Sequence, residues 1–157
     1  MDIYLVEDQP VLNMTYVAII EKLGYSIKSF SCPNDFLEFM GSDGYKPARL
    51  AIITDLLMPE KTGYELMCEV RKAYPDQKFI IVSSTPEQNT GSDLACMYFT
   101  KPMRVEDFEF GLKAILRCLH CPHNVGYAKC NLIDNRDNFN ISDWHCPHRE
   151  QLPANAK

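Results

Sequence analysis

A short apolar stretch near the middle of the chain ends in a single carboxylate. Residues 50–59 have the sequence LAIITDLLMP, so Asp55 follows a nearly all-apolar run and Pro59 ends the stretch. Such a run is typical of a strand that is buried on both faces, as in a parallel sheet covered by helices. The carboxyl ends of these strands face the crevice in which open α/β sheets bind ligands. Taken alone, Asp55 could instead cap the turn that follows the strand.

Three other segments end in the same way, and they favour a ligand site over a turn cap. Glu7 and Asp8 follow the first apolar run, Ser83 and Ser84 follow residues 79–82, and Lys101 with Pro102 follows residues 96–100. Each segment therefore places residues that can bind a phosphate or a metal ion at the end of a predicted strand.

Hydrophobic periodicity and turn residues predict ten alternating elements. Strands are expected at residues 2–6, 26–30, 50–54, 79–83 and 95–99, and helices at 10–24, 33–40, 64–74, 86–94 and 105–119. In the first helix, apolar residues recur at helical spacing at Val11, Met14, Val17, Ala18 and Ile20. The alternation predicts an α/β fold, a doubly wound five-stranded parallel sheet with helices on both faces. It leaves the order of the strands open.

Composition restricts the functional classes. The 157 residues have a formal net charge of −5, and residues 118–157 carry four basic and four acidic residues. Neither part has the basic surface that nucleic-acid binding requires, so no nucleic-acid partner is expected. No apolar run is long enough for a membrane span, and no signal segment begins at Met1. We therefore expect a cytoplasmic protein without a membrane partner.

The residues at the strand ends suit phosphoryl chemistry. Three carboxylates in one crevice, those of Glu7, Asp8 and Asp55, require a cation, and hard oxygen ligands without His or Cys favour Mg²⁺. Lys101 can neutralise a phosphoryl oxygen, and the Ser83 hydroxyl can donate a hydrogen bond to another. A carboxylate that attacks phosphorus forms an aspartyl phosphate. Asp55, on the central strand, is the predicted nucleophile.

The chain resembles the receiver domains of two-component response regulators over residues 1 to 120. The resemblance is carried by the acidic pair, the phosphoacceptor loop, the switch residues and a lysine followed by a proline that is usually cis: Glu7, Asp8, Asp55, Met58, Pro59, Gly63, Ser83, Tyr98, Lys101 and Pro102. It departs from the usual pattern at Ser84, where a smaller residue is common. The segment between Ser83 and Tyr98 is also about one helical turn shorter than usual.

The resemblance implies a signalling role. Asp8, Asp55 and the Leu57 carbonyl would bind Mg²⁺, with Glu7 acting through water. A histidine kinase or a phosphotransfer protein would supply the phosphoryl group, and Ser83 with Tyr98 would respond to it. Such a domain is not an enzyme with a separate substrate, because it promotes only its own phosphorylation and dephosphorylation. Its output would be contact with a downstream protein target.

The C-terminal part is rich in cysteine and histidine, and we interpret residues 121–157 as an extension of the receiver domain. A Cys-x₂-Cys pair with further Cys or His residues at loop spacing is typical of zinc sites. The predicted ligands are Cys118, Cys121, Cys130 and Cys146, with His123, His145 and His148 as alternates. Pro122 stands where covalent haem attachment needs histidine, which disfavours that site. The competing interpretation is a buried Cys118 followed by an unstructured tail.

Three functional hypotheses remain open. The first is a receiver whose phosphorylation changes protein–protein contacts, including those of a homodimer, in which the four cysteines could come from two chains. The second is a transcriptional regulator whose small metal-bound tail contacts DNA, which the neutral charge of that tail disfavours. The third is a degenerate receiver that assembles without phosphate, which the full set of acids, hydroxyl and lysine disfavours.

Overall fold

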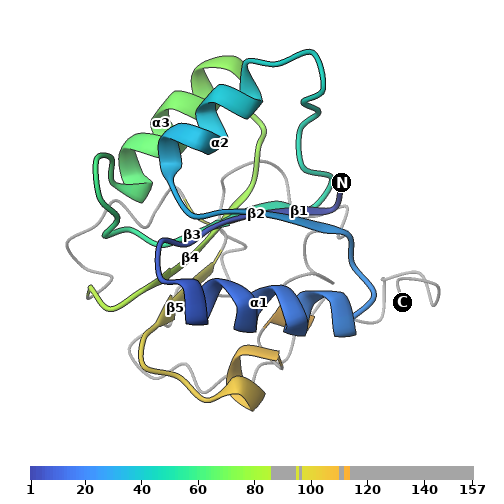
Figure 1. The fold of residues 1–157 in the computed structure, drawn as a ribbon, viewed down its shortest axis with the longest axis vertical. Coiled ribbons are helices and arrows are strands. Elements are labelled where there is room, and N and C mark those ends of the chain that lie inside the picture. The colour runs from blue at the N-terminus through green and yellow to red at the C-terminus, as the bar shows by residue number, and fades with distance from the viewer. Residues whose placement is uncertain (86–94, 96, 110–111, 114–157) are drawn as a thin grey trace, which may run out of the picture.

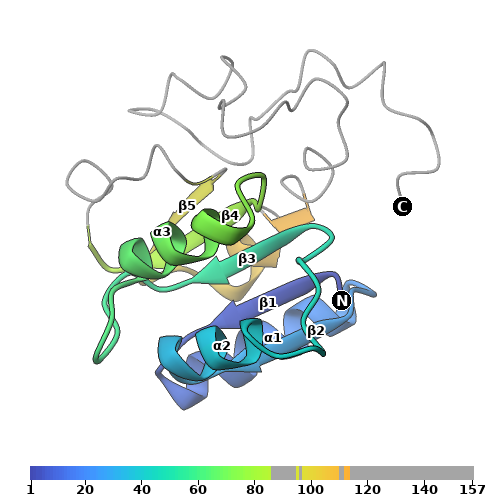
Figure 2. The ribbon, with the colours of Figure 1, turned by 90° about the horizontal axis from the view of Figure 1, so that it is seen from above.

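The computed structural model describes residues 1–85, 95, 97–109 and 112–113. These residues form one parallel sheet of five strands in the order β2-β1-β3-β4-β5 (Figures 1 and 2). The strands are β1 (Ile3–Val6), β2 (Ile27–Phe30), β3 (Ala51–Thr54), β4 (Phe79–Ser83) and β5 (Met97–Thr100). All five predicted strands are confirmed, with ends that differ by at most two residues from expectation.

Helices cover both faces of the sheet, which confirms the predicted fold class. α2 (Pro33–Met40) and α3 (Gly63–Ala73) lie on one face, and α1 (Pro10–Lys22) lies on the other with the helical residues 105–109 and 112–113 (Figure 1). The helix predicted at 86–94 and the end of the last predicted helix lie outside the described residues. Within the described part of the chain, no helix combines the length and apolar character that crossing a bilayer requires.

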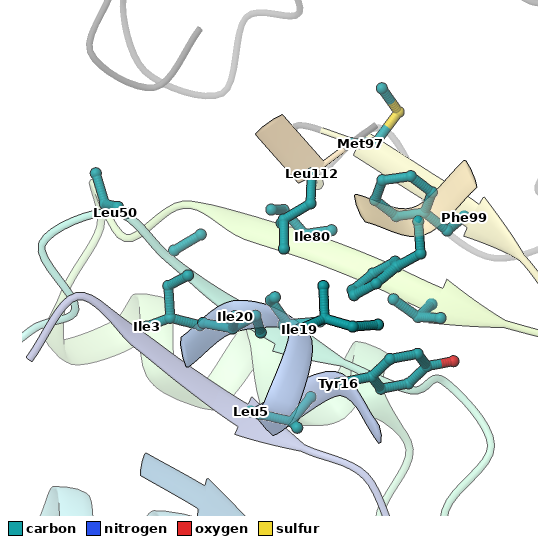
Figure 3. Packing of buried hydrophobic residues seen from close by; sticks show 14 residues of the cluster. Ile3, Leu5, Tyr16, Ile19, Ile20, Leu50, Ile80, Met97, Phe99 and Leu112 are labelled. Atoms are coloured by element: carbon teal, nitrogen blue, oxygen red, sulfur yellow. The ribbon is translucent and has the colours of Figure 1, made fainter. Parts of the chain in front are cut away.

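The strands divide the buried side chains between two cores. Along β1, Ile3 and Leu5 pack into the cluster beneath α1, shown in Figure 3, whereas Tyr4 and Val6 pack into the cluster beneath α2 and α3. This division follows from the two-residue period of a strand. Because both faces are covered, β1, β3 and β4 are buried along their whole length. Their near-continuous apolar sequence has this physical cause.

Local signals set the ends of the helices. Pro10 occupies the first turn of α1, and Gly24, with a φ of 85°, follows its C-terminal end. Only glycine adopts this left-handed conformation at little cost, which agrees with the predicted end of the helix. At α3, Thr62 and Glu65 form a reciprocal capping box.

The predicted inward face of α1 is only partly right. Val11 and Met14 are 76% and 73% exposed, and Ala18 is also exposed. Ile20 is buried and Val17 half-buried as predicted, whereas Tyr16 and Ile19 complete the buried face. Apolar residues occur almost all around this helix, so the period alone could not fix which face turns inward. The Tyr16 ring, which lies 4.7 Å from that of Phe108, belongs to the face that packs on the sheet.

Two smaller expectations also differ from the structure. The sequence of residues 26–30 predicts a half-exposed strand with alternating polar and apolar side chains, but Lys28 and Ser29 are both exposed between half-buried Ile27 and Phe30. β2 is the edge strand of the sheet, where burial is incomplete on both faces. Isolated cysteines such as Cys32 and Cys68 are typically free buried thiols, but both are half-buried here.

Candidate functional site

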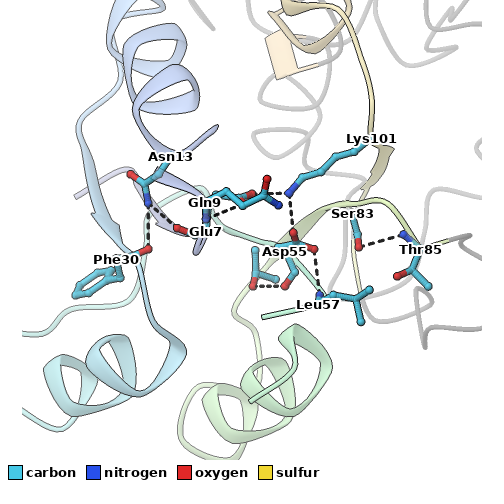
Figure 4. A network of polar contacts seen from close by, with 10 residues as sticks. Glu7, Gln9, Asn13, Phe30, Asp55, Leu57, Ser83, Thr85 and Lys101 are labelled. Atoms are coloured by element: carbon cyan, nitrogen blue, oxygen red, sulfur yellow. Dashed lines mark hydrogen bonds and ion pairs between the residues drawn. The ribbon is translucent and has the colours of Figure 1, made fainter. Parts of the chain in front are cut away.

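Four strands deliver polar side chains to one edge of the sheet. Glu7 and Asp8 follow β1, Asp55 follows β3, Ser83 ends β4, and Lys101 follows β5. Figure 4 shows four of these side chains, those of Glu7, Asp55, Ser83 and Lys101. Backbone hydrogen bonds continue into the site, because the Asp55 amide donates to Val6 O at 3.1 Å and the Lys101 amide donates to Ser83 O at 2.8 Å. The site is thus held by the ends of a rigid sheet.

Three carboxylates converge at this edge. Glu7, Asp8 and Asp55 each offer an oxygen, and these atoms all lie within 4.8 Å of one another. Glu7 and Asp55 are only 1% and 4% exposed. The Asp8 Oδ1 atom is buried, and within the described part of the chain it has no hydrogen-bond partner. A buried carboxylate oxygen without a partner is costly, so this atom points to an absent ligand.

Lys101 joins two of the carboxylates. Its Nζ lies 2.7 Å from Glu7 Oε2 and 2.6 Å from Asp55 Oδ2, and its side chain is 11% exposed. Burial acts to lower the pKa of Lys101, but hydrogen bonds to Asp55 and Glu7 outweigh burial and raise it. Lys101 is therefore charged, and one lysine with three carboxylates gives the cluster a formal charge of −2.

Glu7 already uses both of its carboxylate oxygens. Oε2 pairs with Lys101, and Oε1 accepts a hydrogen bond from the Gln9 amide at 3.3 Å. Burial raises the pKa of Glu7, although the hydrogen bond from Lys101 opposes that shift. Of the acidic pair, Asp8 is therefore the residue with an uncommitted buried oxygen.

The loop after β3 fixes the Asp55 carboxylate. Asp55 Oδ1 accepts a hydrogen bond from the Leu57 amide at 3.1 Å, and the Gly63 amide donates to Leu56 O at 3.0 Å. A Cβ atom on Gly63 would lie 2.0 Å from Asp55 O, so any larger residue would push the backbone of the loop aside. Gly63, picked out by its sequence position, is thus required by the close approach of two backbone segments.

Hydrogen bonds through Thr85 connect Ser83 at the end of β4 with Tyr98 on β5. Ser83 is fully buried, and its Oγ accepts a hydrogen bond from the Thr85 amide at 3.3 Å. The hydroxyl of the half-buried Tyr98 donates to Thr85 O. The two predicted switch residues are therefore connected through the backbone of Thr85, while Ser84 is exposed. The peptide bond between Lys101 and Pro102 is cis, as the resemblance implied.

Comparison with known families shows to which family this fold belongs. Residues 3–109 match the family model of the response regulator receiver domain. The chain belongs to this family. Receiver domains are signalling modules of two-component systems, so the predicted family and the coarse function are confirmed.

Curated relatives are receiver-containing proteins of several kinds. The chain is 30% identical over 118 residues to the sensor kinase CckA of Brucella abortus (strain 2308), which covers 73% of this chain and 12% of that protein. It is 27% identical over 122 residues to the transcriptional regulatory protein CssR of Bacillus subtilis (strain 168), which covers 75% of this chain and 52% of the relative. This receiver therefore spans about half of the regulator and a small part of the kinase.

Solved receiver structures have the same fold. The non-phosphorylated HemR receiver domain from Leptospira biflexa has a TM-score of 0.64 at 23% identity, over 73% of this chain and 93% of that one. A receiver domain from Methylobacillus flagellatus has a TM-score of 0.59 at 27% identity, over 73% and 98% of the two chains.

The structure brings Glu7, Asp8, Asp55 and Lys101 together, as the sequence predicted. The ligands predicted for zinc, from Cys118 to His148, lie outside the described residues, so the zinc site stays a prediction. Asn13 and Thr85 belong to no pattern in the sequence, yet both contact the site. Neither contact leaves a motif, because Asn13 binds backbone carbonyls and Thr85 takes part through its own backbone, and backbone atoms are the same in every residue.

Proposed function

We propose that this receiver accepts a phosphoryl group on Asp55 from a histidine kinase or a phosphotransfer protein. The observation that carries the proposal is the position of Asp55. Its carboxylate is buried at the end of the central strand, beside two other carboxylates and 2.6 Å from the Lys101 ammonium. A carboxylate oxygen of Asp55 attacks phosphorus and the bond from phosphorus to the donor nitrogen breaks. The donor nitrogen keeps the electron pair, and the histidine takes up one proton from water and leaves as neutral imidazole.

The residues around Asp55 act by position and charge. The Leu57 amide holds one carboxylate oxygen by a hydrogen bond, so the side chain has one orientation in the site. Lys101 can follow the new negative charge, because its Nζ already contacts Asp55. Positioning and electrostatic stabilisation account for most of the rate in phosphoryl transfer. The same groups would serve hydrolysis of the aspartyl phosphate, so the receiver promotes only its own phosphorylation and dephosphorylation.

The cluster fits a divalent cation. Its formal charge of −2 and the unpartnered Asp8 Oδ1 are both relieved by such an ion. Asp8, Asp55 and the Leu57 carbonyl would hold Mg²⁺, and Glu7 would act through water. Bound Mg²⁺ would supply positive charge beside the phosphoryl oxygens. TrrA from Thermotoga maritima, a protein of the same fold with a TM-score of 0.61, was solved with Mg²⁺–BeF.

Phosphorylation would be transmitted through Ser83 and Tyr98. A phosphoryl group on Asp55 offers oxygen acceptors to the Ser83 hydroxyl, which in the resting structure accepts from Thr85. Movement of Ser83 would shift Thr85, the residue that holds the Tyr98 hydroxyl. The output is then a changed surface for a downstream protein in the cytoplasm or for a second copy of the chain.

The phosphoacceptor is tested with a small-molecule donor. Incubation with acetyl phosphate and Mg²⁺ is expected to add one phosphoryl mass, and EDTA is expected to prevent the addition. Asp55→Asn is expected to abolish the addition, whereas Asp35→Asn, a change on the exposed side of α2, is expected to leave it unchanged. If Asp55→Asn takes up the label as fully as the wild type, the nucleophile is another residue.

The rest of the chain enters the proposal from sequence alone. We infer a receiver domain at residues 1–120 and a Cys/His-rich extension at 121–157. The extension would bind one structural zinc ion through Cys118, Cys121, Cys130 and Cys146.

A further inference from the structure

Asn13 makes a double contact beside the acidic pair. Its side-chain Nδ2 donates to Glu7 O at 3.0 Å and to Phe30 O at 3.1 Å (Figure 4). An amide nitrogen carries two protons, so both of its donor positions are used. Asn13 is half-buried in the first turn of α1, and its two acceptors belong to the ends of β1 and β2.

These two bonds hold the peptide that leads into Asp8. The Glu7 carbonyl and the Asp8 amide belong to one rigid peptide plane, so fixing one end fixes the other. Phe30 O also accepts a hydrogen bond from the Glu7 amide at 3.1 Å. Asn13 therefore braces Glu7 on the carbonyl side of its backbone, and β2 braces it on the amide side.

Little else in the described residues holds this turn. Gln9 is the N-cap residue of α1, and its side chain makes no capping hydrogen bond. The bond from the Gln9 amide to Glu7 Oε1, at 3.3 Å, is the longest of the polar contacts that Figure 4 shows around Glu7. The Asp8 Oδ1 atom has no partner among these residues that could orient the carboxylate. The direction of Asp8 therefore depends on its backbone, and that backbone depends on Asn13.

We propose that Asn13 is a positioning residue for the divalent cation site. Asn13 fixes the Glu7–Asp8 peptide and, through this peptide, the direction of the Asp8 carboxylate. The inference rests on the proposed function, because it concerns the same site. Removing a group that orients a metal ligand without touching the metal typically lowers metal affinity by about 10- to 100-fold. Asn13 touches only backbone, so we expect the lower end of that range.

The test is direct Mg²⁺ binding to the unphosphorylated full chain, measured by isothermal titration calorimetry without any phosphodonor. Asn13→Ala is expected to raise the dissociation constant about tenfold. Asn13→Ser, whose hydroxyl proton can serve only one of the two carbonyls, is expected to give a smaller rise and remains informative if the alanine variant does not fold. Thr15→Ala is the matched control, because the Thr15 hydroxyl donates to Val11 O within the same helix and not to the loop.

Thermal unfolding in EDTA separates positioning from stability. A residue that only stabilised the fold would lower the melting temperature and leave the Mg²⁺ dissociation constant unchanged. The proposal is overturned if both Asn13 variants bind Mg²⁺ as tightly as the wild type, or if Thr15→Ala weakens binding equally. Asp8→Asn is expected to abolish Mg²⁺ binding. If the wild type does not bind Mg²⁺, or if Asp8→Asn binds it as well as the wild type does, the metal site of the proposed function is wrong, and the inference is wrong with it.

Discussion

Lys101 compensates two buried carboxylates at once, so the resting site depends on this residue more than on any single acid in the cluster. Glu7 and Asp55 are almost completely buried, and both contact Lys101 Nζ. A buried ion pair adds little net stability, because desolvation offsets the attraction, but removing one partner leaves the other charge uncompensated. Removing the Lys101 charge therefore leaves two buried carboxylates without a counter-charge, and their repulsion and desolvation lower the stability of the fold.

Lys101→Met is expected to lower the free energy of unfolding of the metal-free protein by about 3 kcal/mol, since methionine retains the volume but not the charge. Mg²⁺ is expected to raise the melting temperature of this variant more than that of the wild type, because the cluster is then more negative. Thermal and urea unfolding, with EDTA and with Mg²⁺, measure both effects.

Lys22→Met is the control for this measurement. Lys22 also makes an ion pair, with Glu109 at 3.0 Å, but its side chain is 69% exposed. Exposed pairs contribute about 0–1 kcal/mol, so this change should be small and insensitive to Mg²⁺. If Lys101→Met and Lys22→Met lose equal free energies of unfolding, the burial of Lys101 does not make its ion pairs more important to stability.

At the scale of elements, α1 carries an apolar surface that no described residue covers. Val11 and Met14 are 76% and 73% exposed, in the part of the helix that directly follows the acidic pair. Val11 lies three residues after Asp8, so a protein that delivers a phosphoryl group to the site passes close to this surface. We expect that these side chains contact the phosphodonor protein.

The double variant Val11→Gln with Met14→Gln is expected to slow phosphotransfer about tenfold from a phosphorylated phosphotransfer protein that serves the wild type, because apolar contact area is lost. Phosphorylation by acetyl phosphate is expected to stay unchanged, since the site itself is intact. Glu21→Gln, at the other end of α1, is the control. Equal slowing with both donors would instead indicate damage to the site.

The sequence predicted the site better than it predicted α1. Asp55 and Lys101 follow buried strands, and the apolar runs of those strands have a clear boundary at a charged residue. The inward face of α1 has no such boundary, because polar and apolar residues are mixed around the helix. Asn13 was equally invisible, since its acceptors are backbone atoms. The pattern of side chains in a sequence can predict contacts between side chains, but it does not predict contacts to backbone atoms such as those that Asn13 makes.

At the scale of the whole molecule, the sheet order decides which strand ends meet. Lys101 and Glu7 are 94 residues apart in the chain, and β1 and β3 lie side by side although α1, β2 and α2 separate them in sequence. Alternation of strands and helices predicts a parallel sheet, but several strand orders satisfy it. The order β2-β1-β3-β4-β5 places β3 at the centre with β1 beside it. That the strand ends form one site was predicted from the polar residues that end the apolar runs, and the family resemblance supported it.

The family match ends at residue 109, and the chain continues to residue 157. Four cysteines and four histidines fall within residues 118–148. Their spacing, with few apolar residues around them, predicts a segment that would take folding free energy from a bound metal ion. The neutral charge of residues 118–157 argues against a nucleic-acid partner, so a structural role for the metal is the stronger prediction.

Protein purified under reducing conditions is expected to contain about one zinc ion per chain, or a simple fraction if two chains share a site. Cys118→Ser with Cys121→Ser is expected to remove the zinc, because thiolates are the ligands that bind it most tightly. Cys32→Ser with Cys68→Ser is the matched control, since these half-buried thiols lie in the sheet domain, away from the cysteine cluster in the sequence. Elemental analysis of the three proteins measures the metal content, and limited proteolysis with and without a chelator measures its effect on residues after 118. A wild-type protein without zinc, whose proteolysis is the same as that of the Cys118 and Cys121 variant, would contradict the zinc prediction and leave the receiver site unaffected, because that site binds through oxygen atoms of other residues.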